Sequence, residues 1–131
     1  MHRFSRCKLP VELKSVENEC RQSGIEPWEC FFKNHRQMHD QISDALYQAQ
    51  NHCCAYCDCQ LNHPSTPNSA HIEHLEKRSD NPRRIFDWSN MFLSCNHNDS
   101  CGNFKDNSKP RIVYDVKDII DPSKEDPQDF F

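Results

Sequence analysis

The sequence lacks any apolar run long enough to cross a membrane, because polar residues interrupt its hydrophobic stretches throughout the 131 residues. Its first ten residues are polar and end in Pro10, unlike the apolar centre of a secretory signal. We therefore expect a cytoplasmic protein with no membrane contact and no secretory leader. The chain also shows no internal repeat, and its length suits one domain or one small domain with an appendage.

An excess of positive charge is also missing, although strong non-specific nucleic-acid binders use such a charge as a long-range attractive field. The formal net charge is −4. This charge is concentrated in residues 114–131, where six acidic side chains exceed two lysines by four, so the rest of the chain is balanced. We expect a nearly neutral body that acts beside a partner or on a substrate delivered to it.

Apolar residues are few as well, since they make up 35% of the chain and the mean hydropathy is −0.97. A core this small usually needs a disulfide or metal staple. Nine cysteines supply candidates for either. Metal binding is the favoured interpretation, because intracellular thiols stay reduced and an odd count leaves at least one cysteine unpaired in any disulfide scheme.

Residues 1–50 are expected to form an N-terminal helical segment. Pro10 favours the start of a short helix that runs to about Gln22. Pro27 favours the start of a longer helix to about Gln50, because apolar residues recur in it every three or four positions. The aromatic part of this stripe either packs on the rest of the protein or docks a partner, and packing is the simpler interpretation.

Residues 51–113 are expected to form the functional core, followed by an acidic tail, residues 114–131, whose part after Asp121 is expected to be mobile until bound. The patterns predict, in order, strands at 70–75 and 91–94, a short helix at 101–109 and a further strand at 111–114. A long polar connection joins the first two strands. Together with the N-terminal helices, these elements predict an α+β fold.

Two pairs of cysteines predict a structural zinc site, namely Cys54 with Cys57 and Cys95 with Cys101. Structural zinc takes four ligands in a tetrahedron, often from two knuckles that are distant in sequence. One zinc bound by these pairs would hold both ends of the segment between them. Cys53 and Cys59 lie close enough to compete as ligands, but the spacing of Cys54 and Cys57 is the better match.

Between the two cysteine pairs, Glu73 and His74 are adjacent in the first predicted strand, and Asn90 precedes the second. A neutral histidine can activate water for phosphodiester hydrolysis, while a hard divalent cation can stabilise the phosphate charge. A Glu-His pair alone is usually an ordinary pair of polar side chains on the protein surface. The flanking cysteines and Asn90 favour a site. Neighbours in a regular strand point to opposite faces, so we expect the strand to bend or end here.

Four stretches of the sequence resemble HNH endonucleases, namely residues 54–57, 72–74, 86–95 and 101–106. More narrowly, they resemble the PtuB-type HNH proteins of Septu and retron anti-phage systems, over about residues 53–107. The resemblance implies a ββα-metal (HNH, or His-Me finger) core. It also implies a nuclease effector that hydrolyses DNA in a complex with an ABC-type ATPase, with or without a reverse transcriptase and its RNA/DNA product.

The resemblance also assigns roles to individual residues. It implies that His74 is the general base that activates water and that Asn90 holds the loop and orients His74. Glu73 is the implied ligand of a catalytic Mg²⁺ or Mn²⁺, and Asn103 the implied second ligand. Many HNH proteins place this second ligand directly after the cysteine, where this chain has Gly102.

Other polar residues remain candidates for the second ligand, namely Asn96, His97 and Asn98. His71 lies two residues before Glu73, on the same strand face, and could bind the metal or the substrate. Five basic residues are candidates for contacts with the phosphate backbone: Lys77, Arg78, Arg83 and Arg84 in the connection, and Lys105 in the last helix. Nothing in the sequence encodes base recognition.

Two other functions remain open from the sequence. A non-catalytic zinc module that binds nucleic acid or protein would keep the four cysteines but would have no use for Glu73, His74 and Asn90 together. A stand-alone restriction-type HNH nuclease would keep the whole pattern, but the neutral body and the acidic tail fit a docked subunit better.

Overall fold

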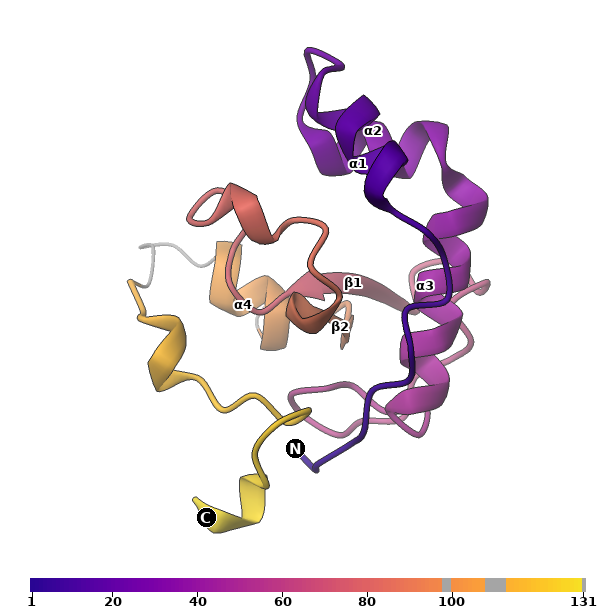
Figure 1. Cartoon of the computed structure of the whole chain (residues 1–131). Coiled ribbons are helices and arrows are strands. Elements are labelled where there is room, and N and C mark those ends of the chain that lie inside the picture. Colours follow the sequence, from indigo (N-terminus) through magenta and orange to yellow (C-terminus); the bar gives the residue numbers. More distant parts are fainter. Residues whose placement is uncertain (98–99, 108–112, 131) are drawn as a thin grey trace.

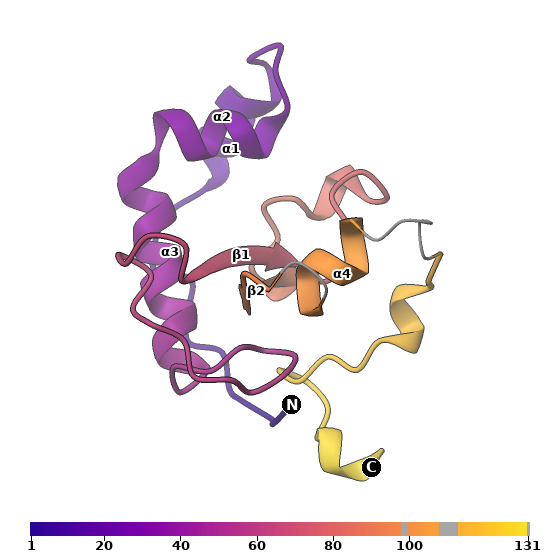
Figure 2. The same ribbon diagram turned by 180° about the vertical axis from the view of Figure 1, so that it is seen from behind.

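The computed structural model describes residues 1–97, 100–107 and 113–130. It has a small α+β fold whose elements are α1 (Lys14–Arg21), α2 (Pro27–Asn34), α3 (Arg36–Ala49), β1 (Ala70–His74), β2 (Met91–Cys95) and α4 (Cys101–Asn107), with short 3-10 turns between them. The two strands lie between α3 on one side and α4 on the other (Figures 1 and 2). None of the helices in these ranges has the length and apolar character needed to cross a bilayer.

The predicted long helix from Pro27 to Gln50 is interrupted at His35 and forms two helices, so the prediction of one continuous helix is wrong. His35 leaves the helical conformation, with φ −129° and ψ 48°, and separates α2 from α3. Its ring stacks on Phe31, and its Nε2 lies 2.8 Å from a carboxylate oxygen of Glu19 in α1. These tertiary contacts hold a bend where the sequence carries neither glycine nor proline.

The start of α2 is fixed by its own sequence. Pro27 occupies the first turn, and the side chain of Glu26 accepts a hydrogen bond of 2.9 Å from the Glu29 amide. The shorter α1 begins at Lys14 rather than Pro10, and its buried residues Val16 and Cys20 face the core.

The two strands pair antiparallel, with Ile72 opposite Leu93 and His74 opposite Met91. All five residues of β2 are buried. Successive side chains alternate between faces, so Met91 and Leu93 join the larger core under the helices, whereas Phe92 joins a smaller cluster with Phe4. The hairpin is therefore covered on both faces, and the strands end within one residue of the predicted bounds.

A buried glutamine fastens α3 to the hairpin. Gln50 is 1% exposed, and its side-chain amide forms a paired contact with the backbone of Leu93. The Leu93 amide donates to Gln50 Oε1 at 2.8 Å, and Gln50 Nε2 donates to the Leu93 carbonyl at 3.0 Å. The side chain thus imitates one residue of a neighbouring strand.

Part of the acidic C-terminal segment is buried where the structure describes it. Pro122 and Pro127 are buried, and the Phe4 amide donates to the Pro122 carbonyl at 3.0 Å. Residues 113–114 are not in a strand, and residues 108–112, which include the rest of the predicted strand and the end of the predicted helix, lie outside the described ranges. The N-terminal chain and this segment thus lie side by side.

Candidate metal centre and active site

Four cysteines meet at one end of the hairpin, as the sequence predicts. Their sulfur atoms all lie within 4.8 Å of one another, and the residues are Cys54, Cys57, Cys95 and Cys101. Tetrahedral zinc with Zn–S bonds of about 2.3 Å separates its sulfurs by roughly 3.8 Å, so the four sulfurs lie close enough together to share one ion after a small adjustment. It could hold a metal ion such as zinc.

Local backbone conformations bring these cysteines together. After α3, Asn51 and His52 both adopt positive φ values, 52° and 65°, which turn the chain back toward β2. The Cys54 amide then donates to the Cys59 carbonyl at 2.9 Å, and the Cys95 amide donates to Cys54 Sγ at 3.4 Å. The hydrogen bond from the Cys95 amide suits a thiolate ligand at Cys54, because hydrogen bonds to a charged group stabilise its charged form.

The thiol of Cys57 is prepared for ionisation. Burial opposes the charge, but hydrogen bonds from the Cys59 backbone and from neighbouring thiols outweigh it and lower the pKa of Cys57 to about 7. Cys53 lies outside the cluster and donates its thiol to the Asn51 carbonyl at 3.4 Å. Cys59 also lies outside it, so among the described residues the sulfur geometry favours the predicted four.

Beside the cysteine cluster lies a cleft of about 460 Å³. Its walls come from β1, the following loop, α4 and the start of α2, so four separate parts of the chain build it. Glu73 and His74 both line it although they are adjacent. β1 ends at His74, and its last four residues, from His71 to His74, all contribute to the lining.

Glu73 is a buried carboxylate, 3% exposed, that lines the cleft. The Tyr56 hydroxyl donates to Oε2, and Oε1 forms an ion pair with Lys105 Nζ at 2.9 Å. Burial raises the pKa of Glu73 to about 8 against the lowering effect of Lys105 and Tyr56. A nearby divalent cation would favour the ionised form, so the residue suits a cation ligand.

Gly102 in α4 makes room for Glu73. A Cβ atom at this position would lie 2.4 Å from Glu73 Cγ and 3.1 Å from Ser94 Oγ. The Gly102 amide donates to the same Ser94 hydroxyl at 3.2 Å, which draws the helix close to the sheet. The position therefore cannot carry a ligand side chain while Glu73 keeps its place.

Replacing Gly102 with alanine should destabilise the protein by about 1–3 kcal/mol, because the overpacked methyl group outweighs the gain of about 1 kcal/mol in helix propensity. Thermal unfolding of the zinc-loaded protein measures this loss. Asn107→Ala, an exposed change at the end of the same helix, serves as the control and should leave the midpoint unchanged. A Gly102→Ala protein as stable as the control would contradict the close packing.

His74 is buried, 4% exposed, and held in one orientation. Its Nε2 lies 2.9 Å from the Ile85 carbonyl, which can only accept, so Nε2 carries the proton and Nδ1 remains a free base. Burial lowers the pKa of His74 to about 4 although the carbonyl raises it. The ring is thus neutral at physiological pH and able to take a proton from water.

Asn90 fixes the loop that carries Ile85, whose carbonyl accepts the hydrogen bond from His74. It is 0% exposed, and its Oδ1 accepts from the Glu76 amide at 2.8 Å. Its Nδ2 donates to the carbonyls of Glu76 and Arg84 at 3.1 and 3.2 Å. Since Ile85 directly follows Arg84, these bonds also locate the carbonyl that orients His74.

Asn90→Ala should therefore cost about 2–4 kcal/mol of unfolding free energy, because it leaves buried backbone groups of Glu76 and Arg84 without partners. Urea unfolding of the zinc-loaded protein provides the measurement. Asn62→Ala removes an exposed amide from a loop and should change stability by less than about 0.5 kcal/mol. Equal stability of the two variants would show that Asn90 does not hold the loop.

The remaining candidate ligands lie around the same cleft. Asn103 lines it and donates from Nδ2 to the His97 carbonyl at 3.3 Å. His71 lines it too, with Nδ1 2.6 Å from Asn96 Oδ1. His97 is exposed and places Nδ1 3.5 Å from Cys95 Sγ. The fallback candidate Asn98 lies outside the described residues.

The five predicted phosphate-contacting residues differ in position. Only Lys77 and Arg78 line the cleft, where Lys77 donates to the Asp106 carbonyl and Arg78 pairs with Glu26. Arg83 is exposed and is not part of the cleft lining. Arg84 and Lys105 form polar contacts within the protein instead.

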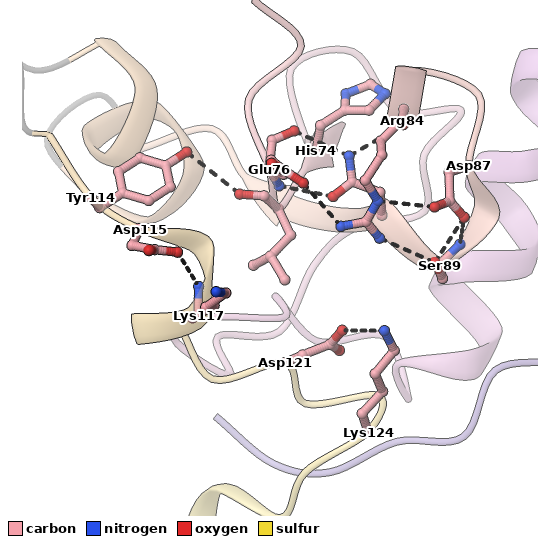
Figure 3. A network of polar contacts seen from close by, with 12 residues as sticks. His74, Glu76, Arg84, Asp87, Ser89, Tyr114, Asp115, Lys117, Asp121 and Lys124 are labelled. Atoms are coloured by element: carbon pink, nitrogen blue, oxygen red, sulfur yellow. Dashed lines mark hydrogen bonds and ion pairs between the residues drawn. The ribbon is translucent and has the colours of Figure 1, made fainter. Parts of the chain in front are cut away.

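Arg84 is held inside a polar network (Figure 3). Its guanidinium pairs with Glu76 at 3.2 Å and Asp87 at 3.0 Å, and donates to Ser89 Oγ at 3.2 Å. Lys105 is similarly enclosed by Glu73, Asp106 and the Tyr114 hydroxyl. Burial lowers the pKa of Lys105, but these partners raise it above its ordinary value. Both cations support the loop and the carboxylate of the site.

Two residues near the site were missed by sequence reasoning. Tyr56 lies between two of the clustered cysteines and holds Glu73, and its position inside the knuckle could have drawn attention to it. Trp28 was assigned only to the helical stripe, yet its ring packs edge-to-face on His74 with centroids 4.7 Å apart.

Comparisons of the chain with models of known families, with curated proteins and with solved structures find no significant match.

Proposed function

We propose that the protein is a metal-dependent endonuclease with an HNH-type ββα-metal core, which hydrolyses phosphodiester bonds in DNA. One observation carries the proposal: a buried neutral imidazole, His74, and a buried carboxylate, Glu73, line the same cleft. The order of β1, β2 and α4 along the chain is the order of elements that such a core requires.

In this proposal, His74 accepts a proton at Nδ1 from the attacking water. The Ile85 carbonyl keeps the other nitrogen protonated, and Asn90 keeps that carbonyl in place. Because the ring is neutral before the reaction, it can act as the general base at physiological pH. The resulting imidazolium can then return its proton to solvent.

Glu73 would hold a catalytic Mg²⁺ or Mn²⁺ through its carboxylate, and Asn103 would be the second ligand. The donor set fits, because hard divalent cations prefer carboxylate and amide oxygens. Such a cation supplies charge neutralisation at the phosphate and at the leaving oxygen. Lys77 and Arg78, which line the cleft, would contact the phosphate backbone beside it.

The first test is cleavage of plasmid DNA by the full chain with Mg²⁺ or Mn²⁺. We expect nicked or linear products, which disappear with a chelator that spares the tightly bound zinc. Glu73→Gln should lose about 100-fold or more in rate and should weaken Mn²⁺ binding measured by calorimetry. Glu17→Gln removes a half-exposed acidic group of α1 that pairs with Arg21 and does not line the cleft, and this variant should retain both properties.

DNA binding without cleavage, in a protein with full zinc content, would favour the non-catalytic zinc module instead. Cleavage whose rate does not change when an ABC-type ATPase partner is added would favour a stand-alone restriction-type nuclease. The same assay thus separates the three functions.

We also propose that the chain acts in the cytoplasm beside an ABC-type ATPase, with or without a reverse transcriptase and its RNA/DNA product, in anti-phage defence. The balanced charge of the body and the exposed apolar side chains of Ile25 and Phe32 support a subunit role. Co-expression of this chain with an ABC-type ATPase from a neighbouring gene should yield a complex with activated cleavage, and the first step is to identify such a gene. Two proteins that elute separately and do not affect each other would refute this.

A further inference from the structure

An aromatic residue of the N-terminal helices contacts the histidine of the cleft. The indole ring of Trp28, in the first turn of α2, packs on the His74 imidazole with an interplanar angle of 89° and a centroid distance of 4.7 Å. Such edge-to-face pairs are a favourable aromatic geometry. Trp28 is 7% exposed, so this contact belongs to the core rather than to the surface.

Other contacts hold the indole in a single position. It stacks on Phe31 at 5.1 Å and lies 5.9 Å from the Phe86 ring in the loop before β2. The helix that carries it is anchored at Pro27 and Glu26. Glu26 also pairs with Arg78 of the cleft at 2.9 Å, which ties the start of α2 to the loop after β1.

His74 needs this second contact to keep one orientation. The only hydrogen bond recorded for its ring among the described residues is the one from Nε2 to the Ile85 carbonyl. One hydrogen bond fixes an atom of a ring but leaves the plane free to swing about that bond. A rigid aromatic surface against the ring removes this freedom, and a base placed about 1 Å away from its productive position can lose about 100-fold in rate.

We propose that Trp28 is a positioning residue for His74, so that the N-terminal helical segment completes the active centre rather than serving only to dock a partner. This inference rests on the proposed nuclease function for its catalytic consequence. Its geometric content, the restraint of the imidazole by the indole, is independent of that function. The residue touches neither the metal nor the substrate in this proposal.

The test uses three variants of the full, zinc-loaded chain, with a fluorescently labelled DNA duplex and Mn²⁺ as probes. Trp28→Leu should lower kcat about 10- to 100-fold while KM stays within about twofold, because orientation rather than binding is lost. Trp28→Phe keeps an aromatic surface and should recover most of the rate. Leu46→Ala creates a cavity in the fully buried core of α3 and should lower stability while kcat is retained.

A second measurement reads the geometry without activity. In nuclear magnetic resonance spectra, the His74 ring signals carry the ring-current shift of a neighbouring indole. Trp28→Leu should remove this shift and broaden the signals, whereas Leu46→Ala should preserve them. If the wild-type chain fails to cut DNA, the nuclease proposal fails, and these spectra still decide whether Trp28 restrains His74.

Two outcomes would overturn the inference. The first is a Trp28→Leu protein whose His74 signals and kcat equal those of the wild type. The second is an equal fall in kcat for Leu46→Ala and Trp28→Leu, which would assign the effect to general loosening of the core.

Discussion

Replacing His74 with alanine should abolish DNA cleavage while the protein remains folded and zinc-loaded. The expected loss is about 100- to 10,000-fold, the usual contribution of a positioned general base. The reason lies in its surroundings, since burial and the Ile85 carbonyl keep the ring neutral with Nδ1 free. The change should spare the loop, because the loop is held by Asn90 rather than by His74.

Cleavage of plasmid DNA in Mg²⁺ or Mn²⁺ gives the rate, and metal analysis with circular dichroism verifies the fold. His63→Ala is the matched control, because His63 is an exposed histidine that pairs with Asp44 away from the cleft. An active, homogeneous His74→Ala protein would end the assignment of the general base.

Cys57→Ser should have the second-largest effect, on zinc content and folding. Loss of one of four thiolates should reduce bound zinc well below one ion per chain and lower the unfolding midpoint by more than about 10 °C, since structural zinc contributes several kcal/mol to folding. The effect should exceed that expected for a half-exposed side chain, because the cluster joins the segment after α3 to both β2 and α4.

Cys53→Ser gives a close comparison four residues earlier, since Cys53 lies outside the cluster. Its zinc content and midpoint should match those of the unmodified chain. If Cys57→Ser kept its zinc and Cys53→Ser or Cys59→Ser lost it, the ligand set would have to be reassigned.

The features that the sequence predicted correctly are those that depend on local patterns of residues. The spacing of the cysteines located the metal cluster, and the apolar runs located β1 and β2 within one residue. Tertiary contacts decided the rest. No local signal marks His35 as a break, because a contact with Glu19 and stacking on Phe31 hold it.

The roles of the basic residues also depend on tertiary contacts that the sequence does not reveal. Lys77, Arg78, Arg83, Arg84 and Lys105 look alike in a sequence, and only their partners distinguish them. Arg84 and Lys105 neutralise buried or half-buried acids, whereas Lys77 and Arg78 reach the cleft. The packing of Trp28 on His74 joins residues 46 positions apart, which helical periodicity cannot predict.

The contact between Gln50 and Leu93 closes an edge of the sheet. A two-stranded hairpin has two outer edges, and each offers unpaired backbone groups to a strand from another molecule. Along β2, the Leu93 amide and carbonyl are taken by Gln50 and by the Ala55 amide, and the Cys95 amide by Cys54 Sγ. We expect that loss of a metal held by the four cysteines would loosen this edge, so that the metal-free protein self-associates by strand addition.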